Sequence, residues 1–134
     1  NYEKNILWVK KRIKSEGLLI WNNSHIAYIL NIRSFELDNS TKPFAGLFIP
    51  KKNLKPIIIS NNSRLRNIIK IKNNFKLLSF ENFKLYLKKN YFKKIEFEFK
   101  YTNFQVYHSL NKFLKINETL IHIDKFISQH ETNH

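Results

Sequence analysis

The chain has 134 residues, which suits one domain with its own hydrophobic core. It carries 24 Lys and Arg against 10 Asp and Glu, a formal net charge of +14, and no cysteine. The composition excludes a disulfide scaffold and thiolate chemistry, and no apolar run reaches the length of a membrane span. We therefore expect a cytoplasmic domain that makes no membrane contact. Because the sequence begins at Asn1 rather than Met, we expect a piece of a longer protein.

The excess of positive charge allows two interpretations. Nucleic-acid-binding proteins are often basic. Alternatively, codon bias in an AT-rich genome produces chains rich in Lys, Asn, Ile, Phe and Tyr, and this chain has only two Gly and three Pro. Phosphate and base recognition favours Arg, but only four of the basic residues are Arg. We therefore favour the bias interpretation.

The N-terminal third predicts a helix, a strand and a second helix. Residues 2–16 form an amphipathic pattern with a basic outer face, and Gly17 follows where a left-handed C-cap would end the helix. The apolar run 18–21 predicts a strand. Ser24 is then expected to cap a short helix that ends near Asn31 and turns three apolar residues to the core: Ile26, Ile29 and Leu30.

The middle of the chain predicts a hairpin and a basic helix. The runs 44–49 and 57–59 are joined by the polar turn 51–53, which indicates two antiparallel strands. The preceding loop, 34–43, is polar. Residues 63–70 predict a helix with a basic outer face, which Lys72 extends. This face is a candidate phosphate-binding patch, formed by Arg64, Arg66, Lys70 and Lys72. A solvated helix face is the preferred interpretation.

The C-terminal half predicts strand 75–79, helix 81–89, strand 95–99, helix 103–113 and strand 120–123, which includes His122. In strand 95–99 the alternation places Glu96 and Glu98 on one wet face, where we expect pairing with lysines rather than acid–base catalysis. Helix 103–113 is expected to bury an aromatic side, with base stacking by its first two members as the alternative: Phe104, Tyr107, Leu110 and Phe113.

The complete order of elements predicts an α/β fold, with a mixed sheet of five to six strands flanked by helices. We expect residues 1–134 to form this single domain. The sequence has no long linker and no internal repeat.

The C-terminus spells H-E-x-x-H with His130, Glu131 and His134. In zinc peptidases this spacing places two His ligands and a general base on one helix face. A third ligand is missing and chain termini fray, so we expect only adventitious metal binding here. We therefore predict no native metal site and no catalytic residue in the chain.

The run Ile26-Ala27-Tyr28-Ile29-Leu30-Asn31-Ile32-Arg33 resembles the I-A-W-L-L-N-[LI]-R-G-S-D motif of the three-domain Xaa-Pro aminopeptidase (aminopeptidase P) family. In that family the motif lies in a creatinase-N-type domain just before the catalytic domain. Tyr28 replaces Trp, and residues 34–36 depart from Gly-Ser-Asp. The resemblance covers residues 4–60 well and most of the chain loosely.

The resemblance implies a creatinase N-terminal-like fold with a ribonuclease H-like motif. It also implies that the chemistry, removal of the residue before an N-terminal proline, belongs to a separate catalytic domain of "pita-bread" fold with two Mn²⁺-type ions. This chain alone is then expected to be inactive and to hold no cofactor. Its expected roles are to pack beside its own catalytic domain, to narrow the cleft for a peptide substrate and to allow a homodimer.

The same resemblance places Asn31 and Arg33 nearest that cleft. Arg33 would either meet a carboxylate of the substrate or neighbouring domain, or cap the carbonyls at the end of its own helix. Trp21 and Tyr28 are expected to be core and interface aromatics. The alternative function is a stand-alone basic nucleic-acid-binding domain, although we do not expect nucleic acid as the main partner.

Overall fold

The computed structural model describes residues 1–31, 46–61 and 74–132, with only the backbone described from 130 to 132. The predicted loop 34–43 and the predicted helix 63–70 therefore lie outside the described residues. Within the described ranges, no helix is both long enough and apolar enough to cross a membrane.

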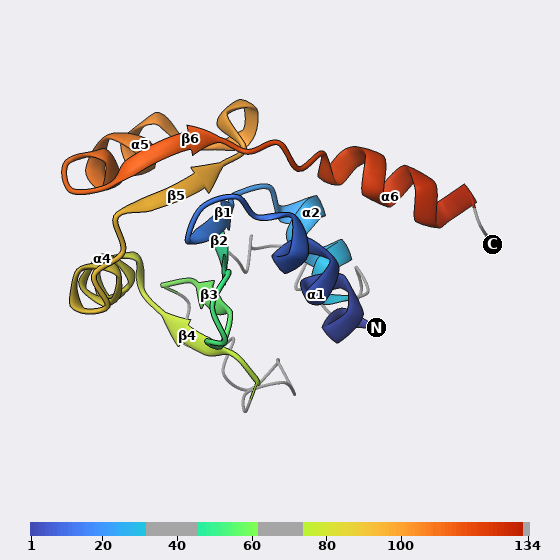
Figure 1. Cartoon of the computed structure of the whole chain (residues 1–134), viewed down its shortest axis with the longest axis horizontal. Helices are drawn as coiled ribbons and strands as arrows, with labels where there is room; N and C mark the ends of the chain where they lie inside the picture. Colours follow the sequence, from blue (N-terminus) through green and yellow to red (C-terminus); the bar gives the residue numbers. More distant parts are fainter. Residues whose placement is uncertain (32–45, 62–73, 133–134) are drawn as a thin grey trace.

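A six-stranded sheet forms the centre of the described structure, in the order β4-β3-β2-β1-β5-β6 (Figure 1). Strand β2 runs antiparallel to β1 and β3, whereas β1, β5 and β6 are parallel neighbours. The mixed sheet and the β2–β3 hairpin confirm the sequence-based expectation. The strands are β1 (Gly17–Ile20), β2 (Gly46–Pro50), β3 (Ile57–Ile59), β4 (Lys76–Leu78), β5 (Lys94–Phe97) and β6 (Lys115–Glu118).

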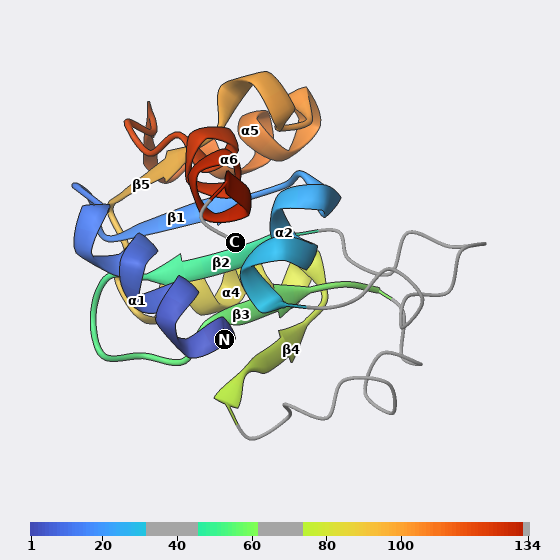
Figure 2. The same ribbon diagram turned by 90° about the vertical axis from the view of Figure 1, so that its right-hand side faces the viewer.

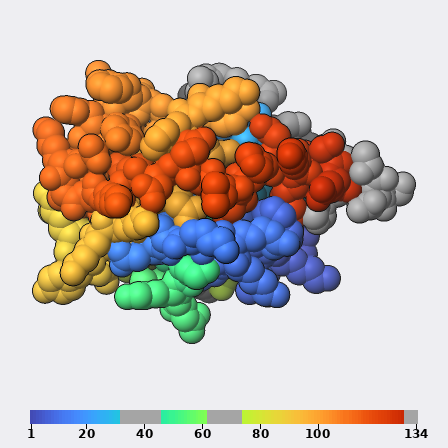
Figure 3. Space-filling view, turned by 45° about the horizontal axis from the view of Figure 1, so that its top comes forward, coloured from blue at the N-terminus to red at the C-terminus, as the bar shows by residue number. Residues whose placement is uncertain are grey.

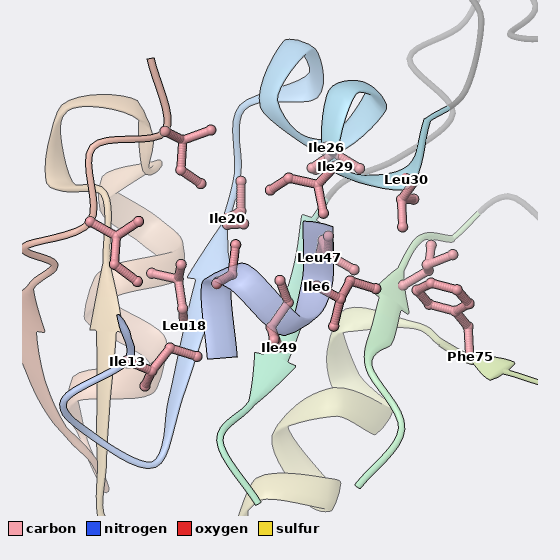
Figure 4. Close-up of a cluster of buried hydrophobic side chains, with 14 residues drawn as sticks. Ile6, Ile13, Leu18, Ile20, Ile26, Ile29, Leu30, Leu47, Ile49 and Phe75 are labelled. Carbon is pink, nitrogen blue, oxygen red and sulfur yellow. The ribbon is translucent and has the colours of Figure 1, made fainter. Parts of the chain in front are cut away.

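Helices cover both faces of the sheet, and the alternation along β1 shows why. Leu18 and Ile20 face a cluster beneath α1 (Tyr2–Arg12) and α2 (Asn23–Leu30), which Figure 4 shows in close-up. Leu19 points to a second cluster beneath α4 (Phe80–Lys89) and α5 (Phe104–Asn111). Successive strand residues point to opposite faces, so one strand contributes to both cores.

Helix α6 (Ile123–Thr132) was not anticipated, and the predicted strand 120–123 is wrong. The last strand is instead β6, whose register pairs Lys115 with Lys94 of β5. Its apolar successors, Ile121 and Ile123, leave the sheet and join the core beneath α1 and α2. Phe126 of α6 is buried and packs 4.1 Å from the ring of Trp8, measured between centroids, which fixes α6 against α1.

Three further expectations are corrected by backbone geometry and burial. Helix α1 ends at Arg12 rather than at residue 16, and Gly17 has no positive φ because it belongs to β1. Asn22, not Ser24, caps α2: its Oδ1 accepts hydrogen bonds from the N–H groups of residues 24 and 25. Phe104 is 76% exposed, and Val106 of α5 is buried instead.

Gly17 is required for close approach between β1 and β2. A Cβ at this position would collide with the ring of Phe48, which is fully buried, and would lie 3.2 Å from the Ile49 carbonyl oxygen. At Gly46 a Cβ would meet the ring of Trp21 at 2.6 Å, but that ring is only half-buried, so displacing it should disturb the core less.

We predict that Gly17→Ala lowers the free energy of unfolding by about 1–3 kcal/mol, because the core must overpack. Gly46→Ala serves as the matched control and should cost clearly less. Urea unfolding followed by circular dichroism measures both values. Equal costs at the two positions would contradict the packing described for Phe48.

Candidate functional site

The candidate site lies at the carboxyl ends of three neighbouring parallel strands. His25 is in the first turn of α2, after β1, and Glu98 follows β5 directly. Asp124 is in the first turn of α6, after β6. In open α/β sheets this edge commonly carries the functional side chains, because the loops after the strands converge there.

His25 is 2% exposed and lies between two carboxylates. Its Nδ1 is 3.1 Å from Oε1 and 3.0 Å from Oε2 of Glu98, which is also buried. Its Nε2 is 2.7 Å from Oδ1 of Asp124. The sequence separations are 73 and 99 residues, so this contact joins three distant segments of the chain. We call the three residues the histidine clamp.

The clamp requires a protonated imidazole. Neutral histidine donates one hydrogen bond, whereas the imidazolium donates from both nitrogens. Burial by itself lowers the pKa of His25, but the hydrogen bonds and charges of Glu98 and Asp124 outweigh it, so the pKa is raised above the ordinary 6.5. The two carboxylate contacts and the direction of the pKa shift both favour the protonated, charged form of His25.

Asp124 is the solvent-facing part of the clamp, with a side chain that is 66% exposed. The hydrogen bond from His25 lowers the pKa of its carboxyl below the ordinary 3.8, and a bond from Tyr101 acts in the same direction. The Tyr101 hydroxyl donates to Oδ2 at 3.0 Å, and the Tyr101 ring meets the His25 ring edge-on. Tyr101 closes the short 3-10 helix η3 (Phe99–Tyr101), so this turn is tied to α6 as well.

A second buried carboxylate, that of Glu96, accepts hydrogen bonds from the connection between α1 and β1 and from the residue that follows β6. Its Oε2 accepts hydrogen bonds from the backbone N–H groups of Lys14 and Ser15, at 2.6 and 2.7 Å, and from the Ser15 hydroxyl. Its Oε1 accepts from the Thr119 hydroxyl at 2.8 Å. Glu96 is 3% exposed, so the predicted wet face of this strand is wrong. Instead of pairing with lysine side chains, Glu96 binds backbone and hydroxyl donors and Glu98 binds His25.

This arrangement supports structure rather than acid–base chemistry. Both ring nitrogens of His25 are occupied, and no free lone pair remains to accept a proton or to bind a metal ion. Among the described residues, no group of three or more His, Cys, Asp or Glu side chains has the geometry of a metal site. The residues present do not fit a metal centre.

The structure describes only part of the predicted site set. Asn31 ends α2 in the left-handed conformation, with φ 57° and ψ 43°, and is exposed. Arg33 and the predicted basic patch, Arg64, Arg66, Lys70 and Lys72, lie outside the described residues. In the H-E-x-x-H segment, His130 and Glu131 lie on α6 without described side chains, and His134 lies outside the described residues.

The histidine clamp was not predicted from the sequence. Glu98 stood out only for its alternation with Glu96, and His25 and Asp124 had no predicted role. One usable signal was present: polar residues follow β5 and β6 directly and follow β1 after Trp21, where parallel strands bring their carboxyl ends together.

Comparison with solved structures identifies the fold, whereas no protein-family model and no curated protein sequence matches. The structure of a proline dipeptidase from Streptococcus agalactiae matches 89% of this chain and 94% of its own, with a TM-score of 0.66 and 13% identity. The creatinase/prolidase N-terminal domain of an X-Pro dipeptidase from Streptococcus pyogenes matches 87% of this chain and 97% of its own, with a TM-score of 0.60 and 17% identity.

The Xaa-Pro dipeptidase from Bacillus anthracis matches 89% of this chain, with a TM-score of 0.64 and 13% identity. There the chain spans only 33% of the enzyme's length. At these identities the likeness shows the fold, which is that of creatinase/prolidase N-terminal domains, as the sequence resemblance implied.

We predict that the protein loses stability on the alkaline side. A raised His25 pKa contributes stability that is complete below about pH 6.5 and is lost as pH rises through the folded-state pKa. The lowered Asp124 pKa contributes stability above about pH 3.8 that is lost on acidification through its own folded-state pKa. Urea unfolding across pH measures this. His25→Gln should remove the alkaline decline, and His108→Gln, at an exposed histidine, should keep it. The same pH profile in both variants would contradict the clamp.

The two carboxylates should differ in energetic weight. Glu98→Gln leaves a buried imidazolium without its buried partner and should lower the free energy of unfolding by about 2 kcal/mol or more. Asp124→Asn affects a largely exposed partner and should cost less than about 1 kcal/mol. Urea unfolding near pH 6 measures both losses in the free energy of unfolding. A larger loss for Asp124→Asn than for Glu98→Gln would contradict this ordering.

Proposed function

We propose that this chain is the non-catalytic N-terminal-type domain of an Xaa-Pro metallopeptidase. Residues 26–33 resemble the motif of that family. The observation that carries the proposal is the fold match, which extends over 87% of this chain and over 97% of the creatinase/prolidase N-terminal domain from Streptococcus pyogenes. The chain matches only a third of the Bacillus anthracis enzyme, which supports the proposal that the catalytic residues lie in another domain.

The structure gives the motif a physical meaning. Ile26, Ile29 and Leu30 are buried in the core beneath α2, so its apolar positions serve packing. Tyr28, where the family has Trp, packs edge-on against Phe126 of α6 with ring centroids 5.8 Å apart. Asn31 adopts a left-handed backbone that Asn tolerates better than most residues. The motif thus describes a helix with a buried side and a fixed exit, consistent with the domain role.

The proposed role is to form one wall of a peptide cleft. Asn31 is exposed at the end of α2 and precedes Arg33 by two residues in the sequence. A peptidase that acts on short peptides excludes folded proteins by narrowing its entrance, and an exposed helix end suits that task. The partners in this proposal are the chain's own catalytic domain, a peptide substrate and a second copy of the protein.

The catalytic metals of the proposed enzyme, of the Mn²⁺ type, would lie outside this domain. The described residues offer no cluster that fits them. The second candidate is nucleic-acid binding as the sole function. The basic helix patch predicted for it lies outside the described residues.

The proposal predicts the size of the native protein. An antibody raised against this domain should detect a product several times larger than 16.3 kDa in the source cells, because a catalytic domain accompanies it. A product near 16.3 kDa would show that the domain acts alone and would contradict the proposal.

The purified chain should not cleave a peptide with proline in second position, with or without Mn²⁺ or Zn²⁺. Release of the N-terminal residue, followed by mass spectrometry, is the measurement. Chelator-sensitive cleavage would overturn the proposal. A Glu131→Gln control would then tell whether the H-E-x-x-H segment is responsible, since that substitution removes its general base.

A further inference from the structure

Basic side chains gather at the amino-terminal edge of the sheet, opposite the histidine clamp. Backbone hydrogen bonds make their segments neighbours: Lys51 N–H donates to the Glu16 carbonyl, Glu16 N–H to that of Lys94, and Lys115 N–H to that of Lys93. Figure 2 shows the α1–β1 connection and the β2–β3 turn at the same end of the molecule. We call this surface the basic edge and define it by six residues: Lys14, Lys51, Lys93, Lys94, Lys112 and Lys115.

Nearby acidic side chains do not neutralise the basic edge. Oε1 of Glu16 accepts hydrogen bonds from the backbone N–H groups of Lys93 and Lys94, at 2.7 and 2.9 Å, and Glu96 similarly holds the backbone at residues 14 and 15. Among the described residues, the one ion pair between a lysine and a carboxylate is Lys84–Glu81 on α4. Lys51 donates from Nζ to the carbonyl oxygens of Lys10 and Ile13, at 3.2 and 2.6 Å, and Lys94 is half-buried, whereas the other four lysines are exposed. The ammonium groups of the basic edge therefore have no acidic partner among the described residues.

An exposed aromatic side chain lies two residues before Lys93 of the basic edge. Tyr91 is 81% exposed and lies between Lys89 and Lys93, which are also exposed. Figure 3 shows the gold connection between α4 and β5 and the green β2–β3 turn projecting on the same side of the molecule. An exposed tyrosine ring near lysines offers a flat surface on which a base can stack.

Tyr91 holds this position against its backbone preference. It occupies the left-handed position that ends α4, with φ 57°, where Gly or Asn is usual. Its N–H donates to the Lys88 carbonyl, and the Phe92 N–H donates to the Leu87 carbonyl, which together form a Schellman motif. The next residue, Phe92, is buried, whereas Tyr91 buries little, so packing does not explain the choice of a bulky side chain. Strained, exposed residues of this kind mark functional positions.

We propose that the basic edge binds single-stranded nucleic acid, with a base stacked on Tyr91 and phosphates on the lysines. Protein interfaces are depleted in Lys, so an acidic protein partner fits this surface less well. Aromatic platforms beside cationic grooves bind unstacked bases, which a duplex does not offer. The inference concerns a surface remote from the proposed peptide cleft and does not depend on that function.

The test is fluorescence anisotropy of the whole chain with a labelled single-stranded oligouridylate of about 16 nucleotides. Binding should persist at about 0.15 M salt and weaken steeply above it. Tyr91→Gly should weaken binding about tenfold and raise resistance to urea, because it removes the stacking ring and relieves the left-handed backbone. Tyr91→Phe keeps the ring and should bind like the unchanged protein.

Charge reversals separate the surface from net charge. Lys93→Glu and Lys115→Glu should each weaken binding and reduce the slope of log affinity against log salt by at least about 0.7. Lys125→Glu on α6 makes the same change in charge at an exposed remote site and should have little effect.

The inference is overturned by any of four results. These are no binding at about 0.15 M salt, a loss with Lys125→Glu equal to that with Lys115→Glu, unchanged affinity in Tyr91→Gly, or complete displacement by poly-glutamate of matched charge. Tighter binding of a duplex of the same length would equally contradict stacking on Tyr91. Because the urea measurement is separate, a variant that fails to fold is recognised and replaced by Tyr91→Ala.

Discussion

The described structure depends on one buried histidine held between two carboxyl groups. His25 joins α2 to the residue after β5 and to the first turn of α6, and these partners lie 73 and 99 residues away in the sequence. The pair with Glu98 is buried, so its attraction is little screened by solvent, whereas Asp124 completes the contact from the surface. The carboxyl ends of three parallel strands are thereby fixed relative to one another, together with the first turn of α2.

The same use of acidic residues shapes the outer surface. Glu16, Glu96 and Glu118 accept hydrogen bonds from backbone N–H groups in connections between elements, rather than from lysine side chains. These three carboxylates thus satisfy backbone donors of the connections. The net charge of +14 follows from composition, but its distribution follows from the fold: the acids near the basic edge bind backbone groups, and the lysines there have no acidic partner among the described residues.

The sequence predicted those elements whose signals are local. The β-branched run 57–59 and the amphipathic pattern of α4 appear where expected, and the motif at residues 26–33 implied the fold that the solved structures share. The clamp has no local signal, because it depends on contacts across 73 and 99 residues. Alternation made Glu96 look exposed, since the pattern does not reveal that helices and loops cover both faces of β5. Strand 120–123 failed because its apolar residues pack beneath α1 and α2 instead of pairing.

The central claim, a charged histidine that organises the carboxyl edge, is tested most directly by the nitrogen chemical shifts of the His25 ring. In ¹⁵N-labelled protein at neutral pH, we expect both ring nitrogens to show the shifts of a protonated imidazolium and to keep them into mildly alkaline solution. A His25 ring that titrates near its ordinary pKa of 6.5, or that shows one unprotonated nitrogen at neutral pH, would contradict the account.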